Sequence, residues 1–170
     1  HIGELGLSTL VLVPRTVDLV DVPVLAAGGI ADGRGLLAAL ALGAAGVTVG
    51  TRLLVSQECP IHDNVKRALI AATEQDTVQV LGSLHNTLRA WKNAAALRVV
   101  EIEAEQGDMW EVLSLAAGTE TRRMLQGGDV DAGVIACSQS IGIVDEIAPV
   151  ADVIQGMVRE AEEIRSRRLP

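Results

Sequence analysis

Two short apolar runs, each followed by glycine, alternate with a helical pattern in the first third of the chain. Residues 22–26 read VPVLA and residues 46–49 read GVTV, and each run suits one buried strand but is too short for a helix. Between them, leucine and alanine recur at helical spacing over residues 36–44, after Asp32 as a preferred N-cap residue. The pattern therefore predicts two strand–turn–helix units in succession.

The rest of the chain reads mostly as helix. A helix is predicted within residues 8–20, and Pro14 favours a start near the proline because that residue is tolerated in a first turn. One more strand is predicted at residues 77–81. Further helices are predicted over residues 65–72, 88–105, 108–116, 119–126 and 149–168.

Each glycine bend lies where a predicted strand turns into the next helix. Gly28 and Gly29 follow the first strand, and Gly50 with Thr51 follows the second. Glycine lets backbone N–H groups approach an anion without a Cβ in the way, the helix start adds further N–H groups, and Thr51 adds a hydroxyl. One Gly-Gly pair alone would indicate only a tight turn. Two bends one unit apart favour a shared phosphate site, as after strands 7 and 8 of (β/α)8 barrels.

The length of the chain indicates how much of such a barrel it can contain. A complete (β/α)8 barrel takes about 250 residues, whereas this sequence has 170 and begins with histidine. We therefore expect the C-terminal part of a longer protein, with the last two barrel strands. The predicted fold class is α/β: the end of a TIM barrel over residues 1–73, then a smaller, mostly helical domain over residues 74–170, with the boundary near residues 73–76.

Composition and charge exclude several classes of function. The chain has no Phe, no Tyr and a net charge of −8, which argues against binding nucleic acid. No apolar run reaches the ~20 residues of a membrane span. Cys59 and Cys137 lack C-x-x-C spacing, so we expect free thiols in a cytoplasmic protein. The histidines are scattered without carboxylates at ligand spacing, and no metal site is expected.

Four stretches of the sequence together resemble one family. AAGGIADGRG at residues 26–35 and GAAGVTVGTRLL at residues 43–54 resemble the flavin-phosphate signature of the nitronate monooxygenase family, which includes flavin-dependent enoyl-acyl-carrier-protein reductases. The resemblance continues in NTLRAWKN at residues 86–93 and GGDVDAG at residues 127–133, and it covers essentially the whole chain.

This resemblance implies a cofactor and roles for named residues. FMN would be the cofactor, with its phosphate on Gly28, Gly29, Gly50 and Thr51. His1, in the sequence His1-Ile2-Gly3, matches a histidine beside the flavin ring that serves as a base or polarises the substrate. Gln139, in the pair Ser138-Gln139, matches an amide donor near the flavin, supplied by the smaller domain that covers the cofactor.

Three hypotheses about function stay open. The first is oxidation of alkyl nitronates by molecular oxygen, which NTLRAWKN and GGDVDAG favour. The second keeps the flavin but uses NAD(P)H to reduce an enoyl thioester. The third is an inactive half-barrel that associates with a partner or forms a homo-oligomer, because an open parallel sheet exposes an unpaired edge.

Other polar residues are interpreted as structural. His62 and His85 lie in loop and cap contexts and are expected at the surface or as caps. Asp129 and Asp131, next to glycines, are interpreted as turn carboxylates rather than as an acid–base pair.

Overall fold

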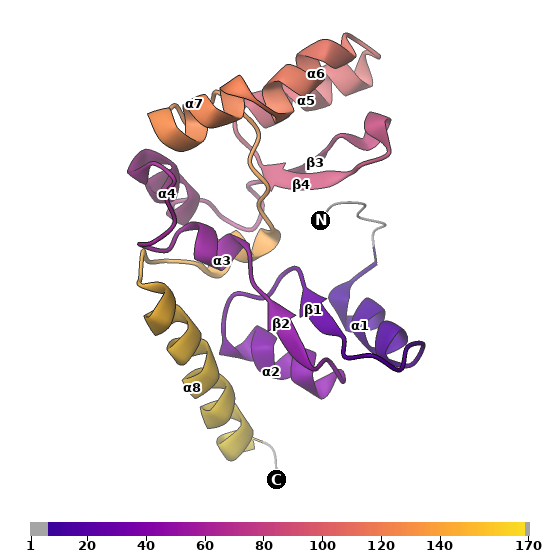
Figure 1. Cartoon of the computed structure of the whole chain (residues 1–170), viewed down its shortest axis with the longest axis vertical. Helices are drawn as coiled ribbons and strands as arrows, with labels where there is room; N and C mark the ends of the chain where they lie inside the picture. The colour runs from indigo at the N-terminus through magenta and orange to yellow at the C-terminus, as the bar shows by residue number, and fades with distance from the viewer. Residues whose placement is uncertain (1–6, 169–170) are drawn as a thin grey trace.

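The computed structural model of the chain describes residues 7–168. β1 (Leu25–Ala27) and β2 (Gly46–Thr48) pair as a parallel sheet, and α2 (Gly33–Ala41) connects them (Figure 1). The Asp32 carboxylate caps α2 by accepting a hydrogen bond from the Gly35 N–H at 2.9 Å. Both predicted strand–turn–helix units are present, but the strands are not buried as predicted: only Ala26 of β1 is buried, and no residue of β2 is. The first strand begins only at Leu25, because Pro23 has no N–H for the ladder.

The first helix continues through its proline. α1 spans Thr9–Val17 with Pro14 inside it, so the predicted start near Pro14 is wrong. Proline removes one hydrogen bond from a helix interior. Val13 and Val17 nevertheless pack into the hydrophobic cluster against the sheet, and this tertiary contact keeps both turns helical.

Most of the other predicted elements are present. The elements after β2 are, in chain order, α3 (Thr51–Leu54), α4 (Asp63–Ile70), β3 (Thr77–Val80), the 3-10 turn η1 (Gly82–Leu84), β4 (Leu88–Trp91), α5 (Ala94–Ala104), α6 (Met109–Ala116), α7 (Thr119–Gly127), the 3-10 turn η2 (Gln139–Ile143) and α8 (Val150–Arg168). The helices predicted at 65–72, 108–116, 119–126 and 149–168 and the strand at 77–81 are confirmed to within two residues at either end.

The long helix predicted over residues 88–105 is wrong in its first third. Residues 88–91 form β4, which pairs antiparallel with β3 and bridges Ala136 through Ala90 on its other side. Asn93 then starts α5, and its side-chain oxygen accepts a hydrogen bond from the Ala96 N–H at 3.0 Å. Apolar residues recur every three to four positions across this boundary by coincidence. Pairing with residues far along the chain decided for the strand.

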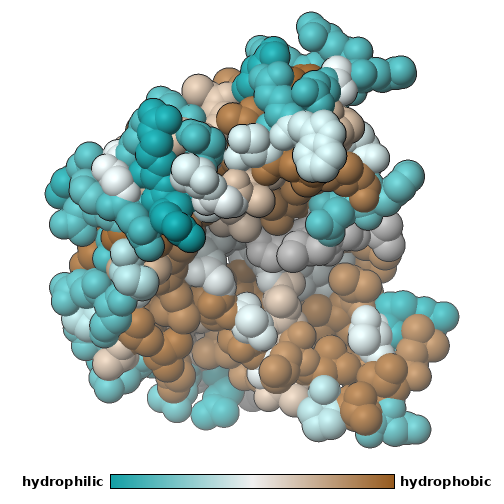
Figure 2. Space-filling view, turned by 45° about the horizontal axis from the view of Figure 1, so that its top comes forward, coloured by the Kyte–Doolittle hydropathy of each residue, from teal (hydrophilic) through white to brown (hydrophobic). Residues whose placement is uncertain are grey.

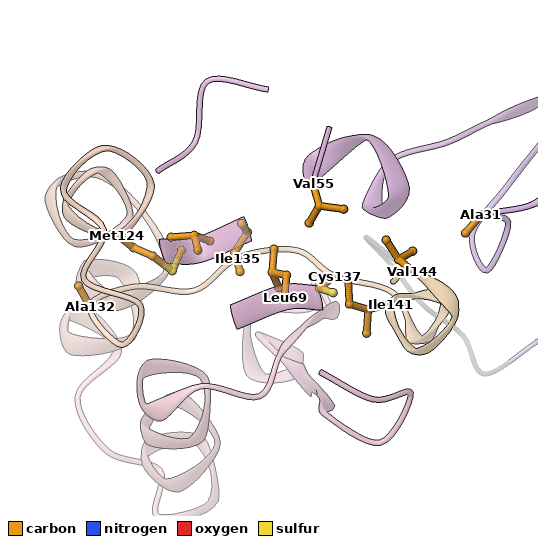
Figure 3. Packing of buried hydrophobic residues seen from close by; sticks show 10 residues of the cluster. Ala31, Val55, Leu69, Met124, Ala132, Ile135, Cys137, Ile141 and Val144 are labelled. Atoms are coloured by element: carbon orange, nitrogen blue, oxygen red, sulfur yellow. The ribbon is translucent and has the colours of Figure 1, made fainter. Parts of the chain in front are cut away.

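Buried hydrophobic side chains of the described residues gather in three clusters. One lies around β1, β2, α1 and α2, and a second lies between the β3–β4 hairpin and α5. The third joins α4, α7 and the segment before η2, where Leu69, Met124 and Cys137 are fully buried (Figure 3). The clusters tie the two halves of the chain together.

The last helix packs on the first half of the chain. A Cβ placed on Gly33 would lie 2.5 Å from the Met157 carbonyl oxygen and 2.6 Å from the Ala161 nitrogen, so α2 and α8 meet backbone to backbone. The Gly33 N–H also donates to the Glu160 carboxylate at 2.7 Å. The division into residues 1–73 and 74–170 stays a prediction, with α8 crossing from the second part to the first.

Candidate functional site

Both glycine bends lie at the same end of the two-stranded sheet. Ala27 pairs with Thr48 in a parallel register, so the chain leaves both strands in the same direction. Gly28 and Gly29 follow β1 directly, and Gly50 comes two residues after β2. The two bends therefore lie at the same edge of the sheet, as a shared ligand site requires.

The bends leave room for a ligand beside the backbone. Gly28 and Gly29 have φ values of +95° and +75°, which L side chains rarely adopt. A Cβ built on Gly28, Gly29 or Gly50 would meet nothing within 4 Å. The hydroxyl of Thr9, at the start of α1, donates to the Gly28 carbonyl at 3.4 Å and so ties the first bend to a helix. The space beside the backbone of these three glycines is therefore open.

Thr51 is nearly buried, with 7% of its surface exposed. Its hydroxyl oxygen accepts hydrogen bonds from the Ser138 N–H and from the Ser138 hydroxyl, both at 3.0 Å. A threonine hydroxyl has two acceptor sites and one donor, so the proton of Thr51 remains to be donated. The helix that begins here, α3, is only four residues long and contributes less dipole than the sequence pattern suggested.

Gln139 lies next to this hydroxyl contact. It is the first residue of η2 and is exposed, between the buried residues Ser138 and Ser140. The hydroxyls of these two serines are 2.6 Å apart. The structure thus brings Thr51 and Gln139, two residues singled out in the sequence, to the same place. His1, the candidate catalytic residue, lies outside the described residues.

Sequence reasoning missed the residues that hold η2 against α3. Ser138 was singled out only as the neighbour of Gln139 in the Ser138-Gln139 pair, not as a partner of α3. Arg52 has an 8% exposed side chain that donates to the Glu146 carbonyl at 3.1 Å and pairs with the Glu146 carboxylate at 3.5 Å. A buried arginine cannot be told from an exposed one by residue type alone, because its partner lies far along the chain.

Two of the stretches that carry the resemblance form one structural joint. The Asn93 amide donates to the Val130 and Gly133 carbonyls at 2.7 and 2.8 Å. The Asp131 carboxylate accepts from the Ala94 N–H at 2.9 Å, and Asp129 pairs with Arg123. Asp129 and Asp131 therefore have the structural roles predicted for them.

The remaining titratable candidates are also structural. His62 is the N-cap of α4, where its Nδ1 accepts from the Asn64 N–H at 3.1 Å, and His85 is exposed. Burial raises the pKa of the Cys137 thiol to about 12. Within residues 7–168, no group of three His, Cys, Asp or Glu side chains could hold a metal. In the same range no helix is long and apolar enough to cross a membrane.

Comparison with known sequences identifies related proteins. A family model described as nitronate monooxygenase matches residues 1–160. A (3aS,4S,5R,7aS)-5-hydroxy-7a-methyl-1-oxo-octahydro-1H-indene-4-carboxyl-CoA dehydrogenase from Rhodococcus jostii is 33% identical over 95% of this chain and 55% of its own length. A protein described as a probable nitronate monooxygenase from Staphylococcus aureus is 51% identical over 42% of this chain and 20% of its own length.

Comparison with solved structures gives the same fold class. FabK from Thermotoga maritima aligns with a TM-score of 0.87 and 36% identity, covering 95% of this chain and 51% of FabK. Nitroalkane oxidase from Streptomyces ansochromogenes aligns with a TM-score of 0.77 and 25% identity, covering 94% of this chain and 45% of that enzyme. The chain spans about half the length of these relatives. The predicted fold class, part of a TIM barrel with a smaller helical region, is confirmed.

Proposed function

The chain belongs to the nitronate monooxygenase family, and from this premise we propose that it carries the phosphate-binding part of an FMN enzyme that oxidises alkyl nitronates with molecular oxygen. The relatives that it matches include a dehydrogenase, a nitroalkane oxidase and a probable nitronate monooxygenase, so redox chemistry is common to them. The nitronate is the finer part of the proposal, and the 51% identity to the staphylococcal protein over 42% of this chain supports it.

One observation carries the cofactor assignment. The backbone at Gly28, Gly29 and Gly50 is open at one end of the sheet, with nothing within 4 Å of any Cβ position. Beside it, the Thr51 hydroxyl can donate its proton to an anion while its oxygen accepts from the Ser138 N–H and hydroxyl. A phosphate dianion is the ligand that such a set of N–H and O–H donors fits.

Each residue then has a part in the reaction. The three glycines and Thr51 would bind the FMN phosphate and hold the cofactor in place. Gln139, which follows the Thr51 partner Ser138, offers an exposed amide as a hydrogen-bond donor. His1 accepts the substrate proton on its imidazole near neutral pH. The bound flavin supplies the electron acceptor for the oxidation.

The test is anaerobic mixing of the protein, loaded with FMN, with propionate 3-nitronate or with NADH. Bleaching of the flavin by the nitronate, followed by oxygen consumption when air is admitted, is the expected result. A preparation that takes up no FMN, or whose flavin the nitronate leaves unchanged, would overturn the proposal.

A second candidate function has an observation in its favour. The relative from Rhodococcus jostii matches over almost the whole chain, and its name describes a carboxyl-CoA dehydrogenase. The thioester in that name suits the alternative in which NAD(P)H reduces the flavin and the flavin reduces an enoyl thioester, although the dehydrogenase is named for the opposite direction. Bleaching by NADH, followed by recovery of the flavin colour on adding an enoyl thioester, would favour this alternative.

A further inference from the structure

Two consecutive residues of α3 hold the two ends of one segment. This segment, residues 138–146, is called the strap; it contains η2 and runs from the hairpin side of the molecule past α3 towards α8 (Figure 1). Thr51 contacts the first residue of the strap, Ser138, and Arg52 contacts the last, Glu146. The strap therefore lies across the element that follows Gly50.

The far end of the strap is anchored by several independent contacts. Arg52 binds both the carbonyl and the carboxylate of Glu146, at 3.1 and 3.5 Å. Beyond it, the Gln57 N–H donates to the Ala148 carbonyl at 3.1 Å, and the Glu58 carboxylate accepts from the Val150 N–H at 2.9 and 3.0 Å. Loss of any one of these contacts would leave the others in place.

At the near end, the Cys137 N–H donates to the Arg89 carbonyl at 3.0 Å, and the contact with α3 is made through one hydroxyl group. Both hydrogen bonds from Ser138 to α3 end on the Thr51 hydroxyl oxygen. The Ser138 hydroxyl also lies 2.6 Å from the Ser140 hydroxyl, where either oxygen can be the donor. Among the described residues these three oxygens have no other side-chain partner, so two proton orders are available to them.

An acceptor beyond Thr51 selects one of these orders. If Thr51 donates outward, its oxygen is free to accept from Ser138 on both sites, and Ser138 in turn accepts from Ser140. If Thr51 instead donates to Ser138, one of the two bonds that hold the strap is reversed and the Thr51 proton is lost to any ligand. A phosphate at the glycine bends favours the first order, and donation to it polarises the Thr51 hydroxyl, so the two bonds that its oxygen accepts from Ser138 become stronger.

We propose that Thr51 and Ser138 are a positioning pair, which couples an anion at the Gly28–Gly29 and Gly50 bends to the order of the strap and so to the position of Gln139. The inference rests on the proposed function, because the anion is the phosphate of FMN. Coupling of this kind is reciprocal: the ligand orders the strap, and the ordered strap strengthens binding of the ligand.

The Ser138 amide reports the coupling directly, since its hydrogen is the one donated to Thr51. We expect FMN and inorganic phosphate to slow hydrogen exchange at this amide by about fivefold or more, the lower end of typical coupling between sites. Riboflavin, which lacks the phosphate, is expected to leave the exchange rate unchanged. The Trp91 amide, which donates to the Ile135 carbonyl at 3.0 Å, serves as an internal reference.

Four variants of the full chain separate the coupling from general stability. Thr51→Ser keeps the hydroxyl and should respond to FMN like the original protein, whereas Thr51→Val should not respond. Ser138→Ala keeps the backbone amide but loses the second bond, so its response should be smaller; it also serves if Thr51→Val does not fold. Thr121→Val removes a buried hydroxyl that has no partner among the described residues, and it should respond fully.

The outcomes distinguish this inference from the proposed function. Tighter binding of FMN than of riboflavin, with an unchanged Ser138 exchange rate, would overturn the coupling and leave the phosphate site standing. An exchange response that persists in Thr51→Val would do the same. Equal binding of FMN and riboflavin would overturn the phosphate site and, with it, the coupling.

Discussion

Asn93 satisfies three backbone groups with one buried side chain. Its amide donates to the Val130 and Gly133 carbonyls, and its oxygen accepts from the Ala96 N–H. Buried backbone groups must be paired, and here a single residue pairs groups on two segments more than 30 residues apart in sequence. The joint between the hairpin and α7 therefore depends on this residue.

Replacing Asn93 by Ala should lower the free energy of unfolding by about 3 kcal/mol, because two carbonyls and the start of α5 lose their partner. Urea unfolding followed by circular dichroism measures the change. Asn86→Ala, at an exposed position in the hairpin loop, is the matched control and should stay within about 0.5 kcal/mol. Equal effects of the two substitutions would contradict the role of Asn93.

The buried Cys137 thiol should make the free energy of unfolding depend on pH in the alkaline range. Burial raises its pKa to about 12, so the folded protein keeps a proton that the unfolded chain releases above about pH 8.5. Because the unfolded state then binds fewer protons, this group's contribution to stability falls as pH rises, by at most about 1.4 kcal/mol per unit between pH 9 and 12.

The slope of unfolding free energy against pH over this range should flatten in Cys137→Ala and persist in Cys59→Ala, whose thiol is only half-buried. The chain has no tyrosine, which removes one other source of alkaline titration. A slope that is the same in both variants would show that Cys137 does not titrate in this way.

At the scale of elements, the contact between α2 and α8 limits which residues can replace Gly33. A Cβ there would overlap backbone atoms of Met157 and Ala161, which cannot move aside as a flexible side chain can. Gly156 lies on α8 itself, and a Cβ on it would meet nothing within 4 Å. The same substitution should therefore have opposite signs at the two positions.

Gly33→Ala is expected to lower the free energy of unfolding by about 1–3 kcal/mol through overpacking. Gly156→Ala should raise it by about 0.5–1 kcal/mol, because alanine loses less backbone entropy than glycine in a helix. Thermal melts of the two variants beside the original chain give the comparison. A loss of stability in Gly156→Ala, or none in Gly33→Ala, would mean that α8 does not pack on α2 in solution.

At the scale of the whole molecule, the region around β1 exposes apolar side chains. Leu10 on α1 and Val22 before β1 are each 67% exposed, and Leu25 on β1 is 60% exposed. Within residues 7–168, β1 pairs only with β2, so its other edge has no strand beside it. Apolar side chains cover much of the lower half of the view in Figure 2. Faces of this kind favour association.

We expect the chain by itself to form a dimer or larger species, and Leu25→Lys to shift it towards the monomer by charging the edge strand. Sedimentation velocity over a range of concentrations measures the change. Leu97→Lys, at an exposed site on α5 away from this face, should leave the association unchanged. A monomer at all concentrations, coloured by flavin, would rule out the interpretation of the chain as an associating half-barrel.

Local signals in the sequence predicted much of the fold and one edge of the site. Asp32 as a cap, the glycines after each strand and the helical spacing of α6, α7 and α8 act within a few residues, so they can be read from neighbours alone. The parallel pairing of β1 and β2 followed from the strand–helix–strand order. These signals were enough to bring Gly28, Gly29, Gly50 and Thr51 to one end of the sheet.

Contacts between distant segments decided the rest. Residues 88–91 became a strand because β3 and Ala136 pair with it, although their spacing also suits a helix. Thr51 meets Ser138, and Arg52 meets Glu146, only because the strap folds back over α3. The sequence by itself determined the short-range structure, since propensity, capping and glycine geometry act locally. Only the tertiary structure decided which distant partners meet, because burial and hydrogen-bond pairing depend on the whole chain.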